Sequence, residues 1–288
     1  MPERTAPHDQ AGIDDHDRGL AFDLGTLVRR RAVLGLLGGV GLAAAAACTA
    51  AGPTTSTASN AAAPTGSSAA TAGGTTASGD AVGEVPTEAA GPYPGDGSNG
   101  PNVLDDAGIV RADITGSFGS STTKAGGIPL TVRLTVTDKS TGAPVSGAAV
   151  YLWHCNREGG YSLYSPGLAG ENYLRGIQPT DAGGTATFAT IFPGCYSGRW
   201  PHIHFEVYRS LAAAVGAGGA VKTSQIALPE AACAAVYATD GYAASVRNLA
   251  AVTLATDNVF GNDRGVKQLA TMSGSATGGY AADLRVGV

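Results

Sequence analysis

Two histidines lie two positions apart in the segment PGCYSGRWPHIHFEVY, residues 193–208. His202 and His204 alternate with apolar residues, and this period of two predicts a half-buried strand. Side chains at positions i and i+2 of a strand point to the same face, so both imidazoles aim at one spot. Neutral imidazoles that converge on one point are typical of a metal site. Two histidines on a solvated strand face are the alternative interpretation.

Few other residues can complete such a site. His8 and His16 precede any folded domain, so His154 is the only other histidine available, and Glu206 is the only carboxylate at a ligand-like spacing. Tyrosine is abundant instead, at positions 161, 164, 173, 196 and 208. A phenol has a pKa near 10 and binds as phenolate only to a hard, strongly acidic ion. A set of His and Tyr ligands therefore points to ferric iron rather than zinc or copper.

The elements that must position these side chains are short strands. Residues 129–138 alternate between apolar and polar, and the cluster KSTGAP at 139–144 predicts a turn. Further strands are expected at 146–155, 184–191, 202–208, 222–228 and 280–288, and a short helix at 229–238. Many short strands with Gly-rich turns indicate an all-β fold, an antiparallel sandwich or barrel.

The N-terminal region is typical of an export signal. Residues 1–48 are polar and acidic at first, then carry Arg29–Arg31 and an apolar stretch rich in Ala and Gly. The pair Arg30-Arg31 followed by Ala-Val-Leu resembles a twin-arginine export signal, and a single membrane anchor is the alternative. Cys48 follows three alanines. Lipidation of Cys48 and plain cleavage near Ala47 or Ala50 both fit this pattern.

Composition divides the rest of the chain. Residues 49–82 are Ala, Thr, Ser, Gly and Pro in the main, which cannot bury enough apolar surface to fold, so we expect a flexible tether. Residues 83–288 form one globular domain. The net charge is −5 and no basic stripe appears, so nucleic acid is not an expected partner. GxGxxG, P-loop and GxSxG motifs are missing, which leaves nucleotide binding and α/β-hydrolase chemistry without support.

Three cysteines fall in the domain, Cys155, Cys195 and Cys233. An exported protein can form disulfides, and three cysteines allow three different single pairings. Three small buried apolar side chains are the alternative. No CxxC spacing occurs, so a cysteine-based zinc site is not expected.

The sequence resembles a known family, the intradiol ring-cleavage dioxygenases of catechols. The resemblance covers about residues 88–288 and is carried by four segments in the family's order: VYLWHCNREGGYSLY (150–164), NYLRGIQPTDAGG (172–184), FATIFPGCY (188–196) and GRWPHIHF (198–205). It implies an antiparallel, immunoglobulin- or prealbumin-like β-sandwich with short helices and long loops. With its twin-arginine signal, this chain would be an exported member.

The resemblance also implies a site. Carried over residue by residue, a mononuclear non-haem Fe(III) would be held by Tyr161 in GGYSLY, Tyr196 in PGCY, His202 and His204. Arg199 matches the arginine thought to stabilise the reacting substrate, and Gln225 in TSQIAL matches a glutamine beyond the ligands. The loop between His204 and Gln225 is longer than is usual in the family. Tyr164 falls where the family often has Phe, which predicts a residue of the pocket wall or the core.

The implied reaction is cleavage of a catechol-type ring by O2 between its two hydroxyl-bearing carbons, giving a muconate-type diacid. In the family one ligand tyrosine leaves the iron when substrate binds, and Tyr196 would be that residue. The sequence does not name the diol. It lacks the long N-terminal helical segment that dimerises catechol-type enzymes, which favours a monomer. The expected location is extracellular or tethered to the cell surface.

Two other functions fit parts of the sequence. One is a non-catalytic exported β-sandwich binding module with a degenerate metal site. The other is a copper or cupin-type oxidase built on the HxH pair, which needs His154 as a further ligand.

Overall fold

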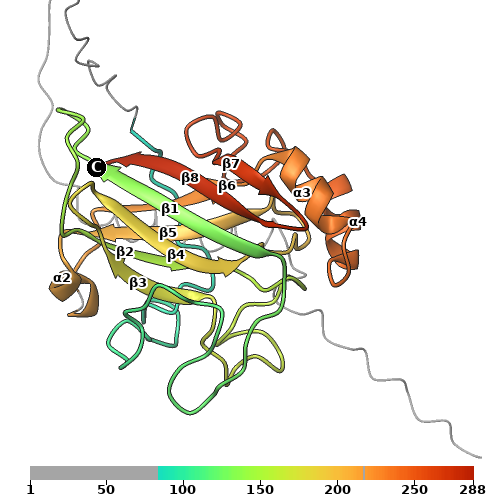
Figure 1. Cartoon of the computed structure of the whole chain (residues 1–288), viewed down its shortest axis with the longest axis horizontal. Helices are drawn as coiled ribbons and strands as arrows, with labels where there is room; N and C mark the ends of the chain where they lie inside the picture. The colour runs from blue at the N-terminus through green and yellow to red at the C-terminus, as the bar shows by residue number, and fades with distance from the viewer. Residues whose placement is uncertain (1–83, 217) are drawn as a thin grey trace, which may run out of the picture.

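The computed structural model describes residues 84–216 and 218–288, and these form a two-layer β-sandwich (Figure 1). One sheet has the order β4-β1-β8-β7, from β4 (Thr185–Ile191), β1 (Pro129–Thr137), β8 (Gly279–Gly287) and β7 (Thr271–Ser275). The other has the order β3-β2-β5-β6, from β3 (Arg175–Pro179), β2 (Ala149–Trp153), β5 (His202–Tyr208) and β6 (Lys222–Ala227). The predicted all-β sandwich is confirmed. The signal region, the linker and Cys48 lie outside the described residues.

The core lies between the two sheets and follows the sequence alternation. Along β1 the apolar residues at every second position, Leu130 to Val136, are buried, while the intervening threonines are half-buried. β5 contributes Ile203, Phe205 and Val207 from the facing sheet to the same cluster. Burying these side chains supplies the main favourable free energy of folding, about 25 cal/mol per Å² of apolar area removed from water.

β5 departs from the prediction of a half-buried strand, because all seven of its residues are buried. The face that carries His202 and His204 points away from the facing sheet. It is covered by a second apolar cluster that includes Ala90, Tyr93 and Trp153. This cover comes from the neighbouring strand β2 and from the segment around residues 90–93, both far from β5 in sequence, so a period of two in β5 alone could not reveal it. The histidines are therefore inside the protein rather than on a solvated face.

The segment of residues 84–97, called the strap below, forms part of this cover. It runs beside β6: the Glu88 backbone N–H donates to the Thr223 carbonyl at 2.9 Å, and Ser224 Oγ donates to the Pro86 carbonyl at 2.7 Å. At its start, buried Lys222 Nζ donates to Glu84 Oε1 at 2.9 Å. The strap thus reaches the histidine end of β5 along a fixed path.

Four elements were not predicted from the sequence: β3, β7, α2 (Leu211–Val215) and α4 (Ala243–Ala250). β3 and β7 contain Gly and lack a clean alternation, and they are strands because they pair with β2 and β8. The predicted helix at 229–238 is confirmed as α3 (Glu230–Tyr237). α3 and α4 lie together at one end of the sandwich, away from α2 (Figure 1).

One strand pair also differs from the expected antiparallel arrangement, because β1 and β8 run parallel. These strands are separated by most of the domain, so no tight hairpin forces them to run in opposite directions.

Among the described residues, no helix is long and apolar enough to cross a membrane. The three domain cysteines, Cys155, Cys195 and Cys233, are buried with free thiols, which matches the alternative of small buried apolar residues.

Candidate metal site

Four polar atoms converge at the beginning of β5. His202 Nε2 lies 3.1 Å from His204 Nε2. The hydroxyl of Tyr161 lies 3.2 Å from His204 Nε2, and the hydroxyl of Tyr196 lies 3.1 Å from His202 Nε2. The structure thus brings together the four residues that the sequence singled out as iron ligands. Separations near 3 Å between donor atoms are what ligands at about 2 Å from a shared ion require.

The two tyrosines come from separate loops that must touch. Tyr161 follows β2, and its backbone N–H donates to Ser165 Oγ at 2.9 Å, which closes a tight turn. Gly159 in the same loop has a φ of +92°, and a Cβ there would lie 3.1 Å from Tyr196 Cβ. Glycine adopts this φ without strain and leaves room for the neighbouring loop. The sequence GGY therefore places Tyr161 against Tyr196.

Both histidine rings are held on their other sides. His202 Nδ1 lies 2.5 Å from the Trp200 carbonyl, so it carries the proton and leaves Nε2 with a free lone pair. The His204 ring stacks on Trp153 with centroids 5.0 Å apart and planes 7° apart. On the strap, Gly91 has a φ of +79°, and a Cβ there would lie 3.1 Å from His204 Cε1. The rings are thus fixed with Nε2 aimed at the convergence point.

Burial sets the protonation of these groups. Desolvation, together with the nearby charge of Arg199, lowers the pKa of His202 to about 3. Burial followed by the neighbouring His202 holds the pKa of His204 well below its usual range. Both imidazoles are therefore neutral, the form that binds metals. Burial also raises the pKa of Tyr161 well above 10, so its ionisation requires a strongly polarising cation in contact with the oxygen.

The residues present fit a ferric ion. Two neutral nitrogens and two phenol oxygens form the donor set, and only a hard, strongly acidic ion binds phenolate well. Within the described part of the chain, no group of three or more His, Cys, Asp and Glu side chains gathers at one point. The tyrosines are therefore essential to any metal site at this position.

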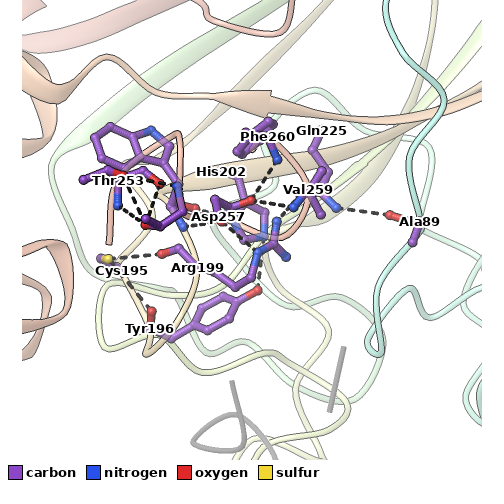
Figure 2. Close-up of polar contacts among 12 residues, drawn as sticks. Ala89, Cys195, Tyr196, Arg199, His202, Gln225, Thr253, Asp257, Val259 and Phe260 are labelled. Atoms are coloured by element: carbon purple, nitrogen blue, oxygen red, sulfur yellow. Dashed lines mark hydrogen bonds and ion pairs between the residues drawn. The ribbon is translucent and has the colours of Figure 1, made fainter. Parts of the chain in front are cut away.

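Arg199 lies beside Tyr196 and His202 and is almost fully buried (Figure 2). Its Nε donates to Asp257 Oδ2 at 3.0 Å, and its Nη2 donates to Gln225 Oε1 at 2.7 Å. Gln225 in turn donates from Nε2 to the carbonyl of Ala89 in the strap at 3.1 Å. Figure 2 shows the guanidinium between Asp257 and Tyr196. The structure thus places Arg199 and Gln225, both predicted from the sequence, in one hydrogen-bonded chain.

Comparisons with known proteins agree with this arrangement. A family model described as Dioxygenase matches residues 100–212, which include both tyrosines, both histidines and Arg199. An intradiol ring-cleavage dioxygenase from Tetranychus urticae superposes with a TM-score of 0.53 and 26% identity, covering 63% of this chain and 87% of that one. A second solved dioxygenase aligns over the same shares with a TM-score of 0.52.

The chain is similar to dioxygenases over residues 100–212, and it shares its fold with a solved intradiol ring-cleavage dioxygenase. A chlorocatechol 1,2-dioxygenase from Rhodococcus opacus is 30% identical over 87 residues, which are 24% of this chain and 34% of that protein. The chain thus spans about a third of the length of this curated relative.

Other residues that the sequence highlighted have partners outside the group of four candidate ligands. His154 is buried elsewhere, with Nε2 2.7 Å from Thr190 Oγ1 and Nδ1 2.8 Å from the Cys155 carbonyl. Glu206 accepts a hydrogen bond from the Tyr208 hydroxyl at 2.7 Å. Tyr164 accepts one from the Gly95 backbone N–H at 2.9 Å, so it fastens the strap. Since His154 is engaged elsewhere, the copper or cupin-type interpretation lacks its third histidine.

Sequence reasoning missed two parts of the candidate site. Asp257 stands in a segment with no recognisable motif, and only its burial beside Arg199 reveals it. Most of the strap falls within the resemblance at residues 88–288, but it lies ahead of the four segments that carry that resemblance. Its Gly91 packs on the His204 ring, and only the structure reveals this contact.

Proposed function

We propose that this protein is a non-haem Fe(III) dioxygenase that cleaves a catechol-type ortho-diphenol between its two hydroxyl-bearing carbons. The observation that carries the proposal is the convergence of two phenol oxygens and two imidazole nitrogens within 3.1–3.2 Å contacts. In the reaction one ring carbon–carbon bond breaks, and both atoms of O2 enter the product. The two carbons become carboxyl groups of a muconate-type diacid, so no external reductant is needed.

Tyr161, Tyr196, His202 and His204 would hold the iron. When bound, Fe(III) would lower the pKa values of the diol and make the ring open to attack by O2. The two tyrosines differ in burial: Tyr161 is buried, whereas Tyr196 is half-buried. Tyr196 can therefore move more easily, and its phenol oxygen is the one placed to accept a proton from the incoming diol.

The remaining residues stabilise charge on the reacting diol and cover the site. Arg199 holds a buried positive charge next to Tyr196, where negative charge develops on the reacting diol. Trp153 and the strap cover His204 and keep water from that side of the site. Arg199 and Tyr196 are thus proposed as catalytic residues, and Gln225 as the residue that orients Arg199.

An oxygen-electrode screen of the purified protein against a panel of catechols tests the proposal. The panel should include a chlorocatechol, because the similar Rhodococcus protein is named for that substrate. Iron content should be measured on the same preparation. Oxygen uptake that depends on a catechol supports the proposal, and iron-replete protein that takes up none with any member supports the non-catalytic binding module.

We also propose that the protein is exported by the twin-arginine route and acts outside the cell or on its surface. The support is the Arg30-Arg31 motif, the Ala/Gly-rich stretch after it and the low-complexity segment 49–82. A lipid anchor on Cys48 and a monomeric state remain predictions from the sequence.

A further inference from the structure

Asp257 is a buried carboxylate with a complete set of donors. It stands in the segment between α4 and β7, and its side chain is fully buried. Oδ2 accepts from Arg199 Nε at 3.0 Å and from the Trp200 backbone N–H at 2.7 Å. Oδ1 accepts from the backbone N–H groups of Val259 at 2.8 Å and Phe260 at 3.0 Å. A carboxylate with four donors has one stable orientation.

The fixed carboxylate in turn fixes the orientation of Arg199. The guanidinium is planar, so holding Nε on Asp257 and Nη2 on Gln225 fixes the plane and direction of the whole group. The side chain of Arg199 is 1% exposed, so water cannot take the place of either partner. Lysine has a single charged nitrogen and could not make both contacts in this geometry.

The same carboxylate joins Arg199 to the histidine side of the site. Trp200 lies between Arg199 and the strand that begins at His202, and its backbone N–H is one of the four donors. Phe260, another donor, places its ring 6.4 Å from the His202 ring at an angle of 67°. Asp257 thus sets where Arg199 stands relative to His202 without contacting the convergence point itself.

We propose that Asp257 is the positioning residue that orients Arg199 for transition-state stabilisation, an inference that rests on the proposed dioxygenase function. Asp257 would not touch substrate. Its contribution to kcat would pass entirely through Arg199, whose cation would otherwise adopt several orientations in the site.

The kinetic test combines Asp257→Asn with Arg199→Met in the iron-loaded protein. Losing one preorganised electrostatic group lowers kcat by about 10²–10³-fold, so we expect losses of this order for each single variant. KM, iron content and the visible absorption band should stay close to wild type in Asp257→Asn, because the ligands are untouched. In the Arg199→Met background, Asp257→Asn should lower kcat no further.

Arg199→Lys serves as a second variant that keeps the buried ion pair. If orientation matters, this variant should lose at least about tenfold in kcat although the charge is retained. Wild-type kcat in Arg199→Lys, or a further loss from Asp257→Asn in the Arg199→Met background, would overturn the positioning role.

Thermal unfolding tests the same pair without any assay of activity. Arg199→Met leaves a buried carboxylate without its cation, and should lower Tm on the order of 10 °C. Adding Asp257→Asn should recover part of this loss. Asp283→Asn, in the half-exposed pair with Arg133, is the matched control and should leave Tm and kcat nearly unchanged.

Different results would contradict the proposed function and the positioning role of Asp257. An iron-loaded wild type that consumes no O2 with any catechol contradicts the proposed function and, with it, the positioning role in that reaction. An active wild type together with a fully active Asp257→Asn contradicts the positioning role alone.

Discussion

At the scale of single residues, the site depends on two tyrosines that differ in their surroundings. Tyr161 is buried, and its hydroxyl lies 3.2 Å from His204 Nε2. Tyr196 is half-buried beside the buried charge of Arg199. The first is placed to be a permanent ligand, and the second to be an exchangeable one.

This difference predicts unequal effects of removing each hydroxyl. Tyr161→Phe should lose most of the iron and the visible phenolate-to-iron band. Tyr196→Phe should keep iron and part of that band, but lose about 10²–10⁴-fold in kcat, the usual contribution of a general acid–base group. Metal analysis, absorption spectra and steady-state kinetics measure these effects. Equal iron loss in both variants would contradict the assigned roles.

Glu88 in the strap is a second residue with a specific expectation. Burial, then the nearby carboxylate of Asp263, raises the pKa of Glu88 from 4.5 to about 7. The folded protein therefore binds more protons than the unfolded chain between these values, and the contribution of Glu88 to stability falls as pH rises through this window. The Tm of wild type minus that of Glu88→Gln should decrease from about pH 4.5 to about pH 7.

Glu84 provides a control of opposite sign. Its hydrogen bond with Lys222 lowers its pKa below 4.5, so its stabilisation is present above that value and is lost as pH falls. The Tm difference between wild type and Glu84→Gln should therefore grow with pH near 4.5. A Glu88→Gln profile parallel to that of Glu84→Gln would show that Glu88 is an ordinary surface carboxyl.

At the scale of elements, β5 supplies the histidines and the strap completes their surroundings. The strap meets β5 at Gly91, whose φ of +79° and close approach to His204 both exclude a side chain. It is fastened along the way by Lys222, Ser224 and Gln225 of β6. The strap, which none of the quoted sequence motifs marks, is thus a structural part of the site.

Gly91→Ala tests this contact, with Gly147→Ala as its matched control. Gly147 has nearly the same φ, +78°, but open space around its Cβ position. Both variants should show left-handed backbone strain of about 1–2 kcal/mol. Gly91→Ala should cost about 1–3 kcal/mol more through overpacking on His204, and should weaken iron retention. Denaturant unfolding and metal analysis check this, and equal costs would argue against the strap contact.

The sequence could predict the strands whose residues alternate and the ligands that share a motif. β1 and β5 show the alternation, and the histidine pair lies on one strand, so spacing alone places both rings together. It could not predict β3 and β7, which are strands through pairing rather than composition. Nor could it find Asp257, because a lone aspartate 58 positions from Arg199 becomes informative only when folding buries them together.

At the scale of the whole molecule, the sandwich holds the site on the outer face of one sheet, and the segment ahead of the domain is proposed to direct export. A tether and an external location would expose the enzyme to aromatic compounds outside the cell. The test of this proposal lies in residues 1–48.

Conservative replacement of the arginine pair tests the export proposal. Arg30→Lys together with Arg31→Lys should keep the protein inside the cell while leaving its charge and fold unchanged. Arg29→Lys is the control and should be exported normally. Cell fractionation with immunodetection in a host that has the twin-arginine machinery measures this, and export of the double variant would refute the route.

The central claim is that two tyrosines and two histidines hold a ferric ion that acts on catechols. Its most direct test follows O2 uptake, product and the visible spectrum together in one iron-loaded preparation. The account predicts a burgundy protein that consumes equimolar O2 with a catechol and forms a muconate-type diacid. An iron-replete protein that is colourless and consumes no O2 with any catechol would contradict it.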